Sequence, residues 1–289
     1  MTLREAVVEA RGKLIAAGLP EEDAIRDAGL LARSVLGWDH AQWWTRADEP
    51  ATPLFAAAFD AHILRRSRHE PVAYITGERE FYGRPFSVNG DVLIPRPETE
   101  LVVEEALAWL KNSAEERPQP VVIDIGTGSG CLALTLALEW PAARVFATDT
   151  SAAALKIAEA NAAKLEATGR VTFIHGEWLG DLTTSIDLIV SNPPYVAESD
   201  RATLPHDVVD YEPAVALFSG ADGLDAIRAL LPAAARRLSP GGALVMEIGH
   251  DQADTVRALA EHAGLQLIQI RPDLQGIPRV VVASASPRI

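Results

Sequence analysis

The feature that most constrains the fold is an apolar run that ends in a glycine-rich turn and continues into an apolar helix-forming stretch. Residues 121–125 read Val-Val-Ile-Asp-Ile, which is typical of a strand buried on both faces of a parallel sheet. Gly126, Gly128 and Gly130 follow at alternate positions, and glycine lets a backbone turn sharply and approach a ligand closely. Residues 131–138 then predict a helix. This succession predicts an α/β fold with a ligand at the turn.

The spacing of the glycines favours a sulfonium cofactor over a dinucleotide. A dinucleotide fingerprint would need its third glycine at position 131, which is Cys131, whereas here an acid, Asp124, precedes a G-x-G-x-G turn. S-adenosylmethionine (AdoMet) has no pyrophosphate and bears a sulfonium cation. An acidic residue at the end of the strand therefore suits AdoMet better than it suits a dinucleotide. We therefore expect AdoMet to bind along the whole turn: Gly126, Thr127, Gly128, Ser129 and Gly130.

Three further cofactor residues, Asp149, Trp178 and Asn192, are expected at the ends of later strand-like runs. Asp149 ends the run 144–149, and an acid about 20 residues after the glycine turn is placed to accept from ribose hydroxyls. Trp178 follows the run 170–175 on a loop that the strand order assigns to the same crevice. We expect Trp178 to wall the adenine, although a half-buried loop aromatic without a ligand is the alternative.

Asn192-Pro193-Pro194-Tyr195 follows the strand-like run 186–191 and carries the expected chemistry. Each proline fixes φ at about −65° and removes a backbone donor, which leaves a stiff loop with carbonyl acceptors. Asn192 Oδ1 and the Pro193 carbonyl can hold the two hydrogens of a planar NH2 group while Tyr195 packs on its face. Orienting such a weakly nucleophilic nitrogen towards a methyl group lowers the barrier. A plain proline turn is the alternative, and the preceding glycine turn makes it the less favoured one.

Together these motifs resemble the class I AdoMet-dependent methyltransferases, and the Asn-Pro-Pro-Tyr segment narrows the resemblance to enzymes that methylate amino groups. Further segments look like the PrmC/HemK glutamine methyltransferase family: residues 70–77, 80–83, 92–100, 212–213, 222–224, 247–249 and 273–276. The resemblance covers nearly the whole chain. It implies methylation of the side-chain N5 of the glutamine in the Gly-Gly-Gln motif of peptide chain release factors. It also makes Arg96, Glu98 and Thr99 secondary site candidates.

One departure and three alternatives accompany the resemblance. The sequence has Gly249-His250 where the family has the order His-Gly, which puts that turn in doubt. A sister family with the same core methylates a glutamine of a ribosomal protein. Methylation of adenine N6 in nucleic acid is a second alternative, and a module that binds without catalysis is a third. The intact Asn192 beside an intact glycine turn opposes the third.

The charge of the chain favours a protein substrate over a nucleic acid. The 289 residues carry a formal net charge of −14, and most of the excess acid lies in residues 99–289. Proteins that bind nucleic acid usually carry a basic stripe that neutralises phosphates. Cys131 is the only cysteine and the histidines lack metal-ligand spacing, so we expect no metal. Without a signal-like segment or an apolar run of about 20 residues, we expect a cytoplasmic monomer that does not contact membranes.

The chain divides into three predicted parts. Residues 1–74 are expected to form a helical substrate-recognition domain, residues 75–98 a β-hairpin linker, and residues 99–289 the AdoMet-dependent methyltransferase domain. The methyltransferase domain is expected to have a seven-stranded, mostly parallel sheet with an antiparallel terminal strand. The last two strands must be antiparallel, because the connection at residues 271–278 is too short for a parallel crossover. Smaller expectations concern Trp38, Trp43 and Trp44 as packing residues, residues 65–68 as a solvated helix end, residues 196–218 as a loop without regular structure, and residues 239–242 as a turn.

Overall fold

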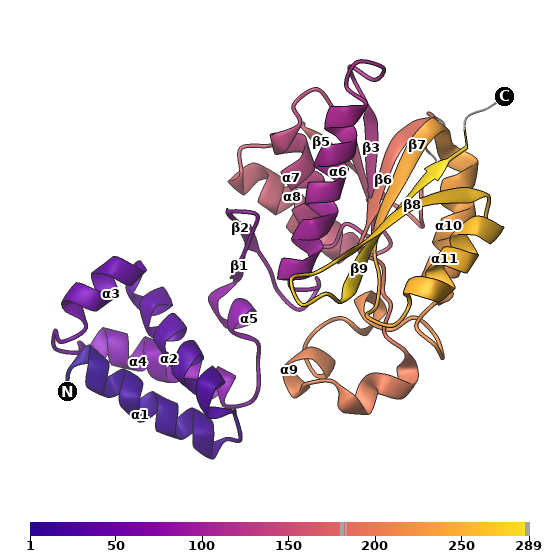
Figure 1. The fold of residues 1–289 in the computed structure, drawn as a ribbon. Helices are drawn as coiled ribbons and strands as arrows, with labels where there is room; N and C mark the ends of the chain where they lie inside the picture. Colours follow the sequence, from indigo (N-terminus) through magenta and orange to yellow (C-terminus); the bar gives the residue numbers. More distant parts are fainter. Residues whose placement is uncertain (180–181, 183, 287–289) are drawn as a thin grey trace. The chain divides into compact units, whose positions relative to one another are not determined.

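The computed structural model describes residues 1–179, 182 and 184–286. The chain forms two compact units (Figure 1). The smaller unit comprises Met1–Glu78 together with Pro205–Tyr211, and the larger comprises Arg79–Leu204 and Glu212–Ile289. The chain therefore passes between the units more than once.

The smaller unit consists of helices around one apolar core. Their bounds are α1 (Leu3–Ala16), α2 (Glu21–Leu36), α3 (His40–Arg46), α4 (Pro53–Arg66), α5 (Val72–Thr76) and α9 (His206–Val209). Thr2, Asp39 and Thr52 cap α1, α3 and α4, because each side chain accepts from the backbone N–H three residues further on. The core side chains include Val7, Leu14, Leu31, Phe55, Phe59 and Ile63. The predicted helical character of this region is confirmed.

Two side chains of this unit differ from their prediction. Trp38 and Trp43 pack against the helical core as expected, whereas Trp44 is 68% exposed. The expectation of a solvated basic helix end was wrong for Arg66, which is buried and donates from Nε to Asp27 Oδ2 at 2.8 Å. Sequence periodicity places a residue on a helix face, but the partner that buries Arg66 comes from a different helix.

Residues Pro205–Tyr211 belong to the helical unit although their neighbours in sequence do not. Tyr211 Oη donates to the Arg68 carbonyl at 2.7 Å within this unit. The prediction that residues 196–218 lack regular structure was wrong, since the segment contains η2 (Glu198–Thr203), α9 and η3 (Ala214–Ala216). Short helical turns of this kind carry too few residues to leave a periodic pattern.

Within the described residues the larger unit holds a seven-stranded sheet in the order β5-β4-β3-β6-β7-β9-β8. The strands are β3 (Val121–Ile125), β4 (Arg144–Asp149), β5 (Val171–His175), β6 (Ile186–Ser191), β7 (Leu238–Glu247), β8 (Leu265–Pro272) and β9 (Pro278–Ala285). β3 to β7 pair in parallel, and β9 is antiparallel to both of its neighbours. This confirms the predicted sheet and its antiparallel terminal strand.

Helices cover both faces of this sheet (Figure 1). α6 (Glu100–Asn112), α7 (Cys131–Glu139) and α8 (Ala152–Lys164) lie on one face, and α10 (Asp225–Arg237) and α11 (Ala253–His262) lie on the other. Val122 of β3 joins the first apolar cluster and Ile123 joins the second, because successive strand residues point to opposite faces. No helix in the described part of the chain is long and apolar enough to cross a bilayer.

A hairpin of β1 (Glu78–Phe81) and β2 (Arg84–Ser87) precedes η1 (Pro97–Thr99) and α6. Asn161 of α8 is fully buried and holds this hairpin against the glycine turn. Its Oδ1 accepts from the Ser87 N–H at 2.7 Å, and its Nδ2 donates to the carbonyls of Ser87 and Ser129 at 3.0 and 2.9 Å. The hairpin is thereby fixed to the sheet edge at which the glycine turn lies.

β7 begins earlier than the sequence predicted. Residues 239–242 were expected as a turn, but they form the start of β7, where the pairing with β6 shifts register. Gly241 has φ +72°, and a Cβ at Gly242 would come within 2.9 Å of the Asp187 carbonyl oxygen. Ser-Pro-Gly-Gly is a common turn signal, and here the glycines permit an irregular strand that stays in the sheet.

Candidate active site

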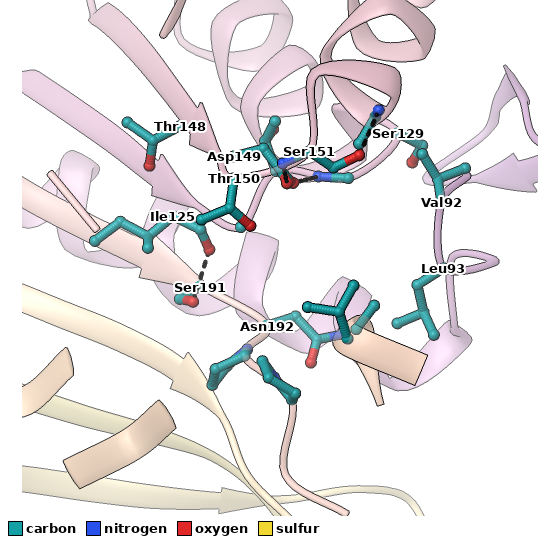
Figure 2. Close-up of a pocket in the computed structure, with 18 of the residues that line it drawn as sticks. Val92, Leu93, Ile125, Ser129, Thr148, Asp149, Thr150, Ser151, Ser191 and Asn192 are labelled. Carbon is teal, nitrogen blue, oxygen red and sulfur yellow. Dashed lines mark hydrogen bonds between the residues drawn. The ribbon is translucent and has the colours of Figure 1, made fainter. Parts of the chain in front are cut away.

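A cavity of about 290 Å³ opens at the carboxyl ends of β3, β4 and β6 in the larger unit. Figure 2 shows Asp149 and Asn192 on opposite sides of this cavity, with Val92 and Leu93 along a third side. The predicted site residues that line it are Gly126, Thr127, Gly128, Ser129, Asp149, Trp178, Asn192, Pro193 and Pro194. Gly130 and Tyr195 are not among the described lining residues. The sequence motifs thus meet at one sheet edge.

The alternate glycines of the turn all adopt left-handed backbone conformations. The φ angles are +73° at Gly126, +54° at Gly128 and +82° at Gly130, a region that other residues adopt at a cost. A Cβ at Gly130 would lie 3.1 Å from Ala158 Cβ and from Leu134 Cδ1. Gly130 therefore contributes close helix packing, whereas Gly126 and Gly128 bring backbone to the cavity wall.

Asp124 supports the turn from within the fold and does not line the cavity. Its Oδ2 accepts from Thr127 Oγ1 at 2.6 Å and from the Ala133 N–H at 3.2 Å. Its Oδ1 has no hydrogen-bond partner among the described residues. Burial raises the pKa of Asp124 to about 7, because a low-dielectric surrounding disfavours the charged form.

Asp149 joins the end of β4 to the glycine turn and to the start of α8. Its Oδ2 accepts from the Gly128 N–H at 2.9 Å, and its Oδ1 accepts from the Ser151 N–H at 2.8 Å. A carboxylate has about four lone-pair sites, so acceptor capacity remains on both oxygens for hydroxyl groups in the cavity. The contact of Asp149 with the ribose of AdoMet stays a prediction.

Trp178 lines the cavity in a strained backbone conformation. Its φ is +49°, which costs a bulky residue about 1–3 kcal/mol. The buried Thr148 holds this conformation, because its Oγ1 donates to the Trp178 carbonyl at 2.5 Å. The strained residue therefore lies at the cavity wall, and its contact with adenine stays a prediction.

Asn192 is held by a chain of hydrogen bonds that the sequence did not predict. Its Nδ2 donates to Thr99 Oγ1 at 3.1 Å, and Thr99 Oγ1 donates to Glu247 Oε2 at 2.6 Å. Tyr195 Oη donates to the other oxygen of Glu247 at 2.9 Å. Glu247, at the end of β7, is 1% exposed, and burial raises the pKa of its carboxyl group. Of the secondary candidates, Thr99 therefore contacts Asn192 directly.

Gln252 holds the loops around Tyr195 together. Its Nε2 donates to the carbonyls of Tyr195 and Gly223 at 2.9 and 3.3 Å, and its Oε1 accepts from the Gly249 N–H at 2.9 Å. A Cβ at Gly249 would approach Gln252 Cδ to 2.9 Å, and the His250 side chain is exposed. The order Gly249-His250 is therefore the one that this turn accommodates. An isolated glutamine gives no sequence signal for such a role.

Arg96 and Glu98 do not line the cavity in the described residues. Arg96 instead forms an ion pair with the buried Glu212, which also accepts from the Ile94 N–H at 3.0 Å. Glu212 thereby fixes the segment before η1 to the chain that leads into η3. Val215 and Ala216 of η3 line the cavity, a contribution that short apolar stretches in a polar loop do not reveal.

The cavity lies where the chain places β4 on one side of β3 and β6 on the other, which is the point at which open α/β sheets bind ligands. On one side of the cavity, the glycine turn is hydrogen-bonded to the carboxylate of Asp149 at the end of β4. Asn192, Pro193 and Pro194 form the opposite wall. This fold and site are those of a class I AdoMet-dependent methyltransferase. Residues 103–214 match the methyltransferase small domain family, and residues 5–77 match the PrmC N-terminal domain family.

Relatives narrow the class further. The release factor glutamine methyltransferase of Cereibacter sphaeroides is 43% identical over 98% of this chain and 98% of its own length. That of Bordetella pertussis is 46% identical over 88% of this chain and 92% of its own. The chain belongs to the release factor glutamine methyltransferase family.

Solved structures at lower identity share the fold. The hMettl16 catalytic domain in complex with a MAT2A 3'UTR hairpin has a TM-score of 0.56 at 16% identity, over 91% of this chain and 94% of that one. A methyltransferase from Pyrococcus furiosus has a TM-score of 0.50 at 17% identity, over 78% of this chain and 98% of that one. Both comparisons concern the fold alone.

Proposed function

We propose that this protein transfers the methyl group of AdoMet to the side-chain N5 of the glutamine in the Gly-Gly-Gln motif of peptide chain release factors. The observation that carries the proposal is the direction of the Asn192 amide. Its Nδ2 is engaged by Thr99, so its Oδ1 is left to accept from a second amide at the cavity. Family membership over almost the full chain supports the same substrate.

The residues of the loop act on the target NH2 group by holding it. Asn192 Oδ1 and the Pro193 carbonyl accept its two hydrogens, and the prolines keep these acceptors fixed before the substrate arrives. AdoMet supplies a methyl group activated by its sulfonium. A glutamine N–H is too weak an acid for a histidine or glutamate to ionise beforehand, so orientation and polarisation by fixed acceptors must carry the rate. The proton leaves the nitrogen to water, and the loop carbonyls act only as hydrogen-bond acceptors.

The position of the following residues at or behind the cavity supports their proposed role in binding the cofactor. The turn of Gly126, Thr127, Gly128 and Ser129 lies along the cofactor, with Gly130 closing the packing behind it. Asp149 accepts from the ribose hydroxyls, and Trp178 borders the adenine. The Tyr195 ring has its hydroxyl tied to Glu247, which supports a role in holding the shape of the loop beside any packing against the amide.

The helical unit, residues 1–74 in the predicted division, supplies most of the release-factor contacts outside the catalytic loop. A glutamine side chain alone offers too little surface for selectivity, and the unit matches the PrmC N-terminal domain family. The acidic net charge of −14 supports a protein substrate over nucleic acid. We further propose that the protein acts as a monomer, and a release-factor substrate supports a cytoplasmic location.

The decisive experiment supplies AdoMet with a labelled methyl group to the protein together with either a release factor, a ribosomal protein or an adenine-containing oligonucleotide. We expect label on the Gly-Gly-Gln glutamine of the release factor, located by mass spectrometry of its peptides. A release factor in which that glutamine is replaced by alanine is the matched control. Label confined to the ribosomal protein or to the oligonucleotide would overturn the proposed substrate.

A further inference from the structure

The methyl transfer needs one particular end of the Asn192 side chain to face the cavity. The oxygen and NH2 ends of a carboxamide are nearly equal in shape, but only the oxygen can accept a hydrogen bond from a target NH2 group. With the NH2 end turned to the target, two donors would face each other. Sterics alone therefore do not select the productive orientation. Something else in the fold must distinguish the two ends of the amide.

The hydrogen bonds behind Asn192 make that distinction. A hydroxyl has a single proton to donate, and Thr99 gives its proton to the buried Glu247 at 2.6 Å. The Thr99 oxygen can then only accept, so it requires the Nδ2 end of Asn192, which lies 3.1 Å away. The orientation of Asn192 is thus fixed by a carboxylate that does not touch it.

The same carboxylate also holds the far end of the loop. Its second oxygen accepts from Tyr195 Oη at 2.9 Å, so each carboxylate oxygen accepts a hydrogen bond from a side-chain hydroxyl group. Thr99 is 2% exposed and Glu247 is 1% exposed, so their hydrogen bond is shielded from bulk water. Buried charge-assisted hydrogen bonds of this kind are short and directional.

We propose that Thr99 and Glu247 are positioning residues for methyl transfer: Glu247 sets the direction of the Thr99 hydroxyl, and Thr99 in turn sets which end of Asn192 faces the target amide. The inference rests on the proposed function only in that the acceptor is an NH2 group. It holds equally whether the amide belongs to a release factor or to another protein.

The test reverses the polarity of the chain of hydrogen bonds. The parent protein for this test carries Tyr195→Phe. In it, Glu247→Gln places an amide at position 247 whose NH2 group has no acceptor on the side of residue 195 and therefore points towards Thr99. The Thr99 hydroxyl then accepts from that amide and donates towards Asn192, which favours the unproductive orientation. We expect kcat to fall by about tenfold or more relative to the parent, the effect of one mispaired hydrogen bond.

Thr99→Val provides the discriminating step, because it removes the hydroxyl at nearly constant shape. In the Tyr195→Phe parent we expect Thr99→Val to lower kcat several-fold, and Thr99→Ser to preserve it. In the Tyr195→Phe, Glu247→Gln background, Thr99→Val should raise kcat, since it removes the wrongly directed donor. A change of sign between the two backgrounds supports the proposal, and losses that add in both backgrounds overturn it.

A second readout does not depend on turnover. The side-chain NH2 resonance of Asn192 can be assigned in ¹⁵N spectra by its loss in Asn192→Ala. We expect it to shift with Thr99→Val and with the Glu247→Gln double variant, and to stay in place with Thr99→Ser. An unmoved resonance in the first two proteins, with AdoMet binding intact, rejects the positioning role. Failure to label a release factor while these shifts occur would reject the substrate and leave the positioning role supported.

Discussion

Hydrogen bonds between residues far apart in the sequence determine what single side chains can do at this cavity. Asn192 receives its orientation from Thr99, and Asp149 supports the glycine turn as well as facing the cavity. A substitution at either position therefore has a direct effect and an effect on its neighbours. Experiments on these residues therefore need controls that separate the direct effect from the effect on neighbouring residues.

The first residue-scale prediction concerns turnover. Asn192→Ala removes the acceptor, so we expect kcat to fall by about a hundredfold or more, as when one positioned polar group is removed from other active sites. AdoMet affinity, measured by calorimetry, should be largely retained. Tyr195→Phe should be milder, because Glu247 keeps its bond to Thr99. Turnover near the wild-type rate in Asn192→Ala would make the loop structural only.

The second residue-scale prediction concerns the cofactor. Asp149→Ala should weaken AdoMet binding by several-fold to about a hundredfold, because charge-assisted hydrogen bonds to ribose are lost. Asp91 also lines the cavity and is exposed, so Asp91→Ala removes the same charge without loosening the turn. We expect that control to bind AdoMet within about threefold of wild type. Equal affinities of the two variants would remove Asp149 from the ribose site.

At the scale of elements, the buried Asp124 supports β3 and the glycine turn that follows it. Because the pKa of Asp124 rises to about 7 on folding, the folded state holds a proton that the unfolded chain releases. Asp124 thus adds stability at low pH that is lost as pH rises towards the folded pKa, and above it the contribution stays constant. The turn is therefore held by a group whose charge changes near neutrality.

This leads to an expected pH dependence. The free energy of unfolding of wild type should fall relative to that of Asp124→Asn as pH rises from about 5 to about 7, at about 1.4 kcal/mol per pH unit. Above about pH 7 the difference should level off. Urea denaturation at a series of pH values measures both proteins. Parallel stability curves for the two proteins across this range would contradict the raised pKa.

The elements that the sequence predicted are those with strong local signals. Residues 121–125 form β3 because an unbroken apolar run fits a strand covered on both faces, and the alternate glycines fit their left-handed conformations. The contacts of Thr99 with Glu247 and of Gln252 with Tyr195 left no such signal, because their partners meet only through tertiary folding. Trp44 shows the same limit, since composition suggested packing that its helix does not provide.

At the scale of the whole molecule, each unit has its own apolar core. Every cavity-lining residue lies in the larger unit. A chain without residues 1–78 should therefore bind AdoMet within about threefold of wild type, yet methylate a whole release factor poorly. A short peptide with the Gly-Gly-Gln sequence should be methylated at similar rates by both proteins. Full activity of the shortened chain on the release factor would show that the helices are not needed for recognition.

The helical unit is discontinuous in sequence, and this limits how it can be exchanged between relatives. Pro205–Tyr211 pack within it, with the His206 ring 5.5 Å from that of His69 and Tyr211 bonded to Arg68. A chimaera that imports only residues 1–78 would join foreign helices to a native insert, whereas one that also imports 205–211 would keep the pair matched. Recombination at a single crossover therefore breaks a unit that two crossovers preserve, so the helical unit is inherited in two separate pieces of the gene.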